Sequence, residues 1–118
     1  MTVYETQIMN IGKDAEAFLE EGIIILFGEN VPPELKDICY NIVVNKIDGT
    51  ISKGMNFLIN NEPYKITAVG SDVHNNLSDL GHITLNFDGS TKPTLPGTIY
   101  LENKKPPYLR IGDKINIL

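Results

Sequence analysis

LSDLGHITLNFDG, residues 77–89, joins a predicted helix to a predicted strand. Gly81 predicts the end of the helix, because glycine adopts the left-handed backbone conformation that closes a helix at little steric cost. From His82 onward polar and apolar side chains alternate. Alternate residues lie on opposite faces of a strand, so this strand has one core face and one polar face. The core face carries Ile83, Leu85 and Phe87, and the polar face carries His82, Thr84 and Asn86.

Two short helices are expected. The first covers 13–22, where Asp14 is placed to accept amide hydrogen bonds at the start and Gly22 to end the helix. The second covers 71–81 and leads into the alternating strand. Its candidate N-caps are Ser71 and Asp72, and its apolar stripe is Val73, Leu77 and Leu80.

Short strands are expected over most of the remaining chain, because Gly, Pro, Asn and Asp recur at short intervals between β-rich runs. Seven or more such strands predict a mainly β fold, organised as a single domain over 1–118. Closure removes the unpaired edges of a sheet, so we expect a small closed or partly open β-barrel with two short helices, and an open sandwich as the second architecture. The expected strands are 3–11, 22–27, 39–45, the two arms of a hairpin within 55–70, 82–87, 98–102 and the end of 106–118.

Composition narrows the class of protein. With 15 acidic and 10 basic residues the net charge is -5, and no Lys/Arg stripe interleaved with aromatic residues appears, so nucleic acid is not an expected partner. The longest apolar run, Ile23–Phe27, is far shorter than the roughly 20 residues of a membrane helix, so direct membrane insertion is not expected either. The first residues do not resemble a signal peptide, and a single cysteine, Cys39, fits a reducing compartment. We expect a cytoplasmic location.

His82 is the residue with the most chemistry to offer, and two roles are open for it. An imidazole just after a helix can hydrogen-bond the last carbonyls and interact favourably with the helix dipole. An imidazole on the polar face of a strand can instead act as a nucleophile. The sequence alone does not choose between a helix-end contact and a reactive side chain.

The other candidates carry less chemistry. His74 lies on the flank of the second helix, and its separation from His82, with no third Cys or His nearby, does not favour a metal site. Carboxylates near Cys39 would raise the pKa of its thiol, which opposes thiolate chemistry. Arg110 fits a solvated turn better than a phosphate clamp. No nucleotide-binding or hydrolase motif occurs, so no cofactor is expected.

Several segments together resemble a known family. ITAVGS (66–71) followed by NLSDLGHITLNFDG (76–89) is similar to the signature of the glucitol/sorbitol-specific IIA component of the bacterial phosphotransferase system. The resemblance extends over almost the whole chain and implies a cytoplasmic phosphocarrier with a β-barrel-like fold. Further similar segments are YETQIMNIG (4–12), ELKDIC (34–39) and PGTIYL (96–101).

The resemblance also implies partners and a site. Such a protein accepts a phosphoryl group on histidine from the histidine-containing phosphocarrier protein and passes it to the sorbitol-specific IIB domain of the IIB/IIC membrane components. The family's usual acceptor histidine lies in the strand that the matching cysteine opens, where this chain has Ile42. His82 is then the only histidine within the family motif, so we take it as the candidate acceptor. The alternative is a docking or regulatory module of the same pathway that carries no phosphate.

Overall fold

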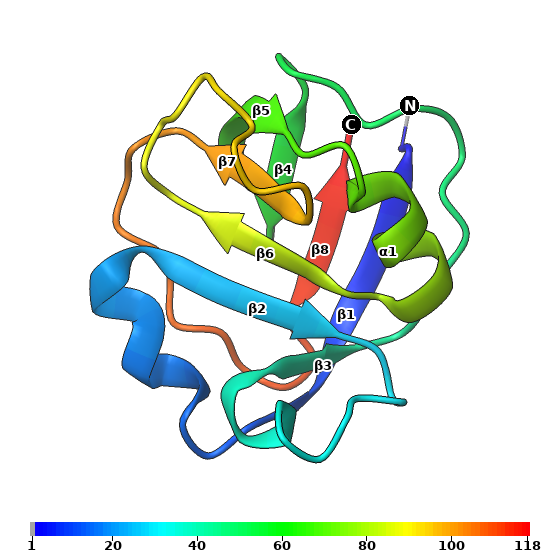
Figure 1. Cartoon of the computed structure of the whole chain (residues 1–118), viewed down its shortest axis with the longest axis vertical. Coiled ribbons are helices and arrows are strands. Elements are labelled where there is room, and N and C mark those ends of the chain that lie inside the picture. Colours follow the sequence, from blue (N-terminus) through cyan, green and yellow to red (C-terminus); the bar gives the residue numbers. More distant parts are fainter. Residues whose placement is uncertain (1) are drawn as a thin grey trace.

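Eight strands form a closed barrel in the computed structural model, which describes residues 2–118 (Figure 1). Neighbouring strands follow the order β1-β3-β2-β6-β7-β5-β4-β8, and β8 returns to β1. The predicted closed barrel is therefore confirmed, and the open sandwich is wrong. The strands are β1 (Tyr4–Ile11), β2 (Ile23–Phe27), β3 (Tyr40–Ile42), β4 (Asn56–Ile59), β5 (Glu62–Val69), β6 (Ile83–Asn86), β7 (Thr98–Leu101) and β8 (Lys114–Ile117).

The sheet is mixed. β2 pairs with β3 and β6 with β7 in parallel, and the other neighbours are antiparallel. β4 and β5 form the predicted hairpin, in which Asn60 and Asn61 both have positive φ, at 49° and 71°. That conformation is the one a two-residue turn of matching twist requires, and asparagine tolerates it better than most residues.

The alternating strand of the opening stretch is confirmed. Ile83, Leu85 and Phe87 are buried, and the residues between them are half-buried on the outer face. Facing them across the antiparallel ladder, Ile24 and Leu26 of β2 are also buried. The two strands therefore contribute one continuous wall to the barrel core.

The predicted helices form with two differences. The first is a 3-10 helix, η1 (Ala15–Glu21), and Asp14 makes no side-chain capping bond. The Asp14 backbone amide donates to the Asp37 carbonyl. A second 3-10 turn, η2 (Lys36–Ile38), precedes β3. The glycine that ends the first helix, Gly22, has the expected left-handed backbone, with φ of 75°.

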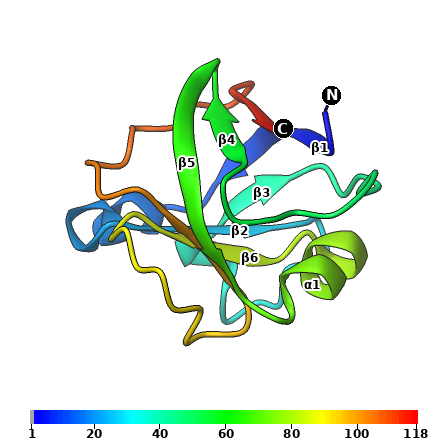
Figure 2. The same ribbon diagram turned by 90° about the horizontal axis from the view of Figure 1, so that it is seen from above.

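The second helix is α1 (Val73–Leu80), which lies at one corner of the barrel (Figure 2). Val73 and Leu77 are buried as predicted, and Gly81 ends the helix with φ of 68°. Leu80 was assigned to the same core stripe, but its side chain is 45% exposed because the last turn of the helix extends past the core. Asp72 stands at the N-cap position without a side-chain capping bond. With helices this short, nothing helical in residues 2–118 could cross a bilayer.

The predicted strand 39–45 is shorter than expected. It ends at Ile42, and the following residues run beside β1 without a backbone ladder. The register between β1 and β3 shifts between Ile8 and Asn10, and beyond it side chains replace the ladder. The Thr6 hydroxyl donates to the Val43 carbonyl at 2.6 Å.

Candidate functional site around His82

His82 lies where α1 leads into β6, beside the end of β2 (Figure 1). The ladder pairs Leu26 with Ile83, so the next position places Phe27 opposite His82 on the outer face of the barrel. The two rings stack, with centroids 4.3 Å apart and planes at 21°. Phe27 is 4% exposed although it does not belong to the core cluster. Phe27 lies on the outer face of the barrel and is covered there by other side chains, of which the His82 imidazole is one.

Two glycines allow this approach. The Gly28 amide donates to the Leu80 carbonyl at 2.9 Å, which joins the end of β2 to the end of α1. A Cβ on Gly28 would clash with Val44 Cγ2 and lie 2.6 Å from the Leu80 carbonyl oxygen, and one on Gly81 would lie 3.0 Å from the Gly28 nitrogen. Only residues without a Cβ can approach this closely, so the two glycines set the position of the His82 backbone.

The end of β2 is held from its other side as well. Asn41 of β3 stands opposite Phe27 in the parallel ladder, and its Nδ2 donates to the Gly28 carbonyl at 3.1 Å. Several carbonyls at the end of α1 accept backbone amides, since the Gly81 and His82 amides donate to Leu77 and Asn76. Within residues 2–118 the His82 ring makes no hydrogen bond to these carbonyls, which argues against a helix-capping role.

The imidazole of His82 is half-buried and uncharged at neutral pH. Burial lowers its pKa below the ordinary value of 6.5, because the charged form loses hydration. No other side chain in the described chain hydrogen-bonds to either ring nitrogen, so a reactive nitrogen here would be oriented by the stack on Phe27 rather than by the acceptor that a nucleophilic histidine usually has. A neutral imidazole has a free lone pair, which is the form that attacks phosphorus.

His74 differs from His82 in its exposure and in its contacts. It is exposed on α1, as the sequence predicted, and its Nε2 lies 3.0 Å from the Gly49 carbonyl oxygen. That contact joins α1 to the segment between β3 and β4. Across residues 2–118, no three His, Cys, Asp or Glu side chains gather as a metal ion would require.

Exposed apolar side chains lie near the glycine crossing that precedes His82. Leu80 and Val44 are 45% and 40% exposed, and both border the crossing of the two glycines. Val44 also lines a hollow of about 260 Å³ together with Met9, which is 50% exposed, and with Glu29. We call Met9, Val44 and Leu80 the apolar rim. Sequence reasoning missed it because Leu80 fitted a core stripe and Val44 fitted a strand that ends earlier.

The other candidates are placed away from reactive surroundings. Ile42 is 2% exposed and pairs with Ile8 across β1 and β3, so it is a packed core side chain. Cys39 is fully buried, and burial raises the pKa of its thiol to about 11. The direction matches the sequence prediction, but the cause is desolvation rather than nearby carboxylates. Arg110 is exposed in a turn, where its amide donates to the Asp113 carboxylate.

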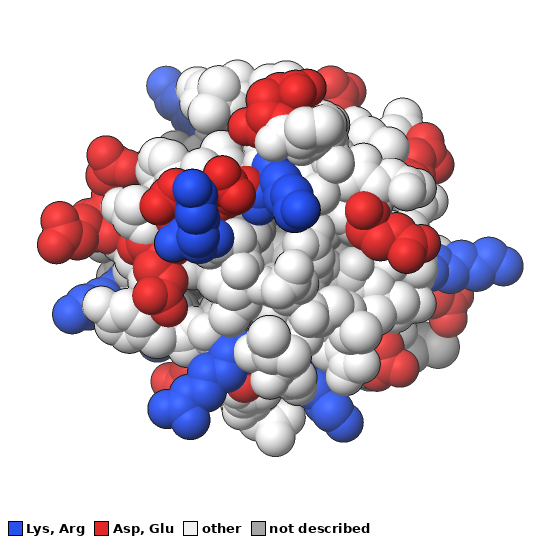
Figure 3. Space-filling model, turned by 90° about the horizontal axis from the view of Figure 1, so that it is seen from below, with Lys and Arg blue, Asp and Glu red and all other residues white. Residues whose placement is uncertain are grey.

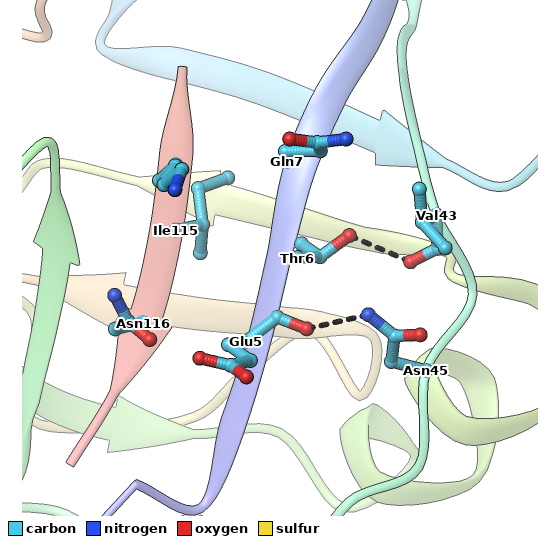
Figure 4. Close-up of a pocket in the computed structure, with 8 residues that line it drawn as sticks. Glu5, Thr6, Gln7, Val43, Asn45, Ile115 and Asn116 are labelled. Carbon is cyan, nitrogen blue, oxygen red and sulfur yellow. Dashed lines mark hydrogen bonds between the residues drawn. The ribbon is translucent and has the colours of Figure 1, made fainter. Parts of the chain in front are cut away.

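A separate groove of about 300 Å³ follows the seam where β3 ends, between β1, β8 and the segment after Ile42 (Figure 4). Two bonds bridge the seam, from Thr6 to the Val43 carbonyl and from Asn45 Nδ2 to the Glu5 carbonyl at 2.8 Å. The groove is open and its lining is mixed in charge. It shares Val43 with the hollow beside the apolar rim but does not include His82.

Charged side chains are dispersed over the face of the molecule in Figure 3. Acidic and basic groups lie mostly towards its edges, and an uncharged area crosses the middle. Elsewhere in residues 2–118, two ion pairs, Lys13–Asp37 and Lys104–Glu102, each at 3.7 Å, are exposed to solvent and add little stability. Neither sign of charge is concentrated on this face.

Comparison with known proteins assigns the chain to a family. The family model for the "PTS system glucitol/sorbitol-specific IIA component" matches residues 3–116. The glucitol/sorbitol-specific EIIA components of Shigella flexneri and Escherichia coli (strain K12) are each 35% identical over 110 residues, covering 93% of this chain and 89% of the relative. The crystal structure of a PTS system IIA component from Enterococcus faecalis V583 matches with a TM-score of 0.86 at 32% identity, covering 98% of this chain and 99% of that one. The chain therefore belongs to the glucitol/sorbitol-specific IIA family, the phosphocarrier components of this sugar phosphotransferase system.

Proposed function

We propose that this IIA component carries its phosphoryl group on His82, in the cytoplasm, between the histidine-containing phosphocarrier protein and the sorbitol-specific IIB domain. The observation that supports His82 is the state of its ring. The imidazole is half-buried, makes no side-chain hydrogen bond within the described residues, and has its pKa lowered by burial, which favours the neutral form. The other histidine, His74, contacts the Gly49 carbonyl with its Nε2.

The transfer needs a nucleophilic nitrogen and an in-line approach. A lone pair of the His82 imidazole attacks phosphorus while the bond from phosphorus to the donor nitrogen breaks, and that bond's electrons return to the donor imidazole. Passing the group to the next component repeats the step with His82 as the leaving group. The stack on Phe27 leaves the nitrogens at the edge of the ring, open to a partner.

Charge on the phosphoryl oxygens has to be stabilised during this step. Burial lowers the pKa of His82, and within residues 2–118 its ring forms no ion pair or side-chain hydrogen bond with a charged group. The end of α1 beside it is the electronegative end of the helix, which disfavours a bound anion. We infer that the positive charge comes from the partner, which docks on the apolar rim next to the ring.

Ile42 favours a second function. The position of the family's usual acceptor holds a buried aliphatic side chain that cannot take a phosphoryl group. A family member without phosphotransfer would still dock on other components of the phosphotransferase system and act as a regulatory module. The two functions differ in one measurable property, which is whether the chain gains phosphate.

The test uses the intact protein with phosphoenolpyruvate, the general phosphotransferase enzyme and the histidine-containing phosphocarrier protein. Intact-protein mass is measured for wild type, His82→Gln and His74→Gln, which form a matched pair of substitutions. An acid-labile gain of one phosphoryl group in wild type and His74→Gln, absent in His82→Gln, is the expected result. A folded wild type that gains no mass would leave the regulatory module as the function.

A further inference from the structure

We propose that Phe27 is the positioning residue of His82, holding the imidazole flat on the outer face of β2 so that its nitrogens point to an arriving partner. The proposal rests on His82 as the phosphoryl acceptor. It concerns the orientation of the ring, which is a property that can be measured separately from phosphate transfer.

The placement of Phe27 is unusual for its strand. Residues of β2 that share the core face, Ile24 and Leu26, are buried inside the barrel, and Phe27 is turned to the outside by the period of two. It is nevertheless 4% exposed and is absent from the core cluster. A large aromatic ring on the outer face contributes little to the barrel interior, so its local contact with His82 gives it a specific use.

The stack on Phe27 restricts the rotation of the His82 imidazole, and no hydrogen bond to another described side chain does so. One face of the ring lies against Phe27 with a centroid separation of 4.3 Å, so rotation about the side-chain bonds would lose this contact. Because no other described side chain bonds to the ring nitrogens, the stack is the contact that sets the plane in which they lie. A nucleophile gains rate when its reactive atom is held close to the attack geometry.

The base under the stack is rigid. Gly28 is joined to the end of α1 through the Leu80 carbonyl and to β3 through Asn41. These bonds hold the backbone on both sides of the ring pair. The backbone next to Phe27 is therefore held without a partner, so the imidazole is positioned before the partner arrives.

The experiment compares Phe27→Leu, Phe27→Tyr and Phe87→Leu. Leucine removes the aromatic face and tyrosine restores it. Phe87, which is 3% exposed and meets Tyr64 edge to face instead, is the matched control. Imidazole NMR signals are followed through a pH titration in each protein, and the rate of phosphorylation by the phosphorylated carrier protein is measured beside it.

In Phe27→Leu we expect the His82 ring protons to lose the ring-current shift, its pKa to rise towards 6.5, and phosphorylation to slow by about tenfold or more. Phe27→Tyr should restore all three, and Phe87→Leu should leave them unchanged. Unaltered His82 signals in folded Phe27→Leu, or an unaltered rate in a protein that is phosphorylated, would overturn the proposal. If wild type accepts no phosphate, the proposed function fails, and the NMR signals alone decide whether Phe27 orients the ring.

Discussion

Gly28→Ala is expected to destabilise the protein strongly, although it adds a single methyl group. The new Cβ would clash with Val44 Cγ2 and lie 2.6 Å from the Leu80 carbonyl oxygen, which accepts the Gly28 amide at 2.9 Å. Overpacking of this kind costs about 1–3 kcal/mol and the lost backbone hydrogen bond about 1 kcal/mol, so the free energy of unfolding should fall by about 2–4 kcal/mol. With a urea slope of about 1–3 kcal/mol per molar, the unfolding midpoint should move down by roughly 0.7–4 M.

The control for Gly28→Ala is Gly97→Ala. A Cβ on Gly97 would meet Asn76 Nδ2 at 3.5 Å, an ordinary contact, and its φ is not in the left-handed region. That substitution should therefore be neutral or stabilise the protein by up to about 1 kcal/mol. Urea unfolding followed by circular dichroism measures both variants. Equal midpoints for Gly28→Ala and wild type would refute the close backbone crossing that seats His82.

Three further results are expected. Tyr40→Phe removes the hydroxyl of Tyr40, the single buried side-chain N or O atom without a hydrogen-bond partner in residues 2–118, so thermal unfolding should show unchanged or higher stability. A loss of stability above about 1 kcal/mol would mean that the hydroxyl is hydrogen-bonded. Asn61→Gly should stabilise the hairpin by about 0.5–1 kcal/mol, and Asn60→Gly should stabilise it less, because Asn60 Oδ1 accepts the Lys114 amide at 2.9 Å. Equal increases in the free energy of unfolding, measured by urea denaturation, would contradict that bond. Burial lowers the pKa of His82, so as pH falls the unfolded chain binds a proton before the folded chain does, and the free energy of unfolding should drop from pH 6.5 towards the lower folded pKa. His82→Gln should remove this part of the pH dependence, and a pH profile identical to that of wild type would contradict the assignment.

Local patterns were enough to predict much of the barrel. Alternation from His82 to Phe87 identified β6 and its core face, and Gly81 and Gly22 identified the ends of two helices. These features depend on backbone preferences within a few residues. The number of short strands then favoured closure, because an open sheet of this size would expose two edges.

The surroundings of His82 could not be predicted in the same way, because they depend on which strands pair. Phe27 meets His82 only through the register of β2 with β6, which are more than fifty residues apart along the chain. In the sequence Phe27 is the last residue of a uniformly apolar run, which gives no sign of an outward face. Val44 joined the apolar rim because β3 ends early, and that end depends on the register shift in β1.

The most direct test of His82 as the phosphoryl carrier observes its imidazole in the phosphorylated protein. NMR signals of both histidine side chains are recorded before and after phosphorylation by the histidine-containing phosphocarrier protein, and again after the sorbitol-specific IIB domain is added. We expect the His82 nitrogen signals to shift on phosphorylation and return when the IIB domain is added, while the His74 signals stay in place. A protein that has gained one phosphoryl group with the His82 signals unchanged would contradict the assignment.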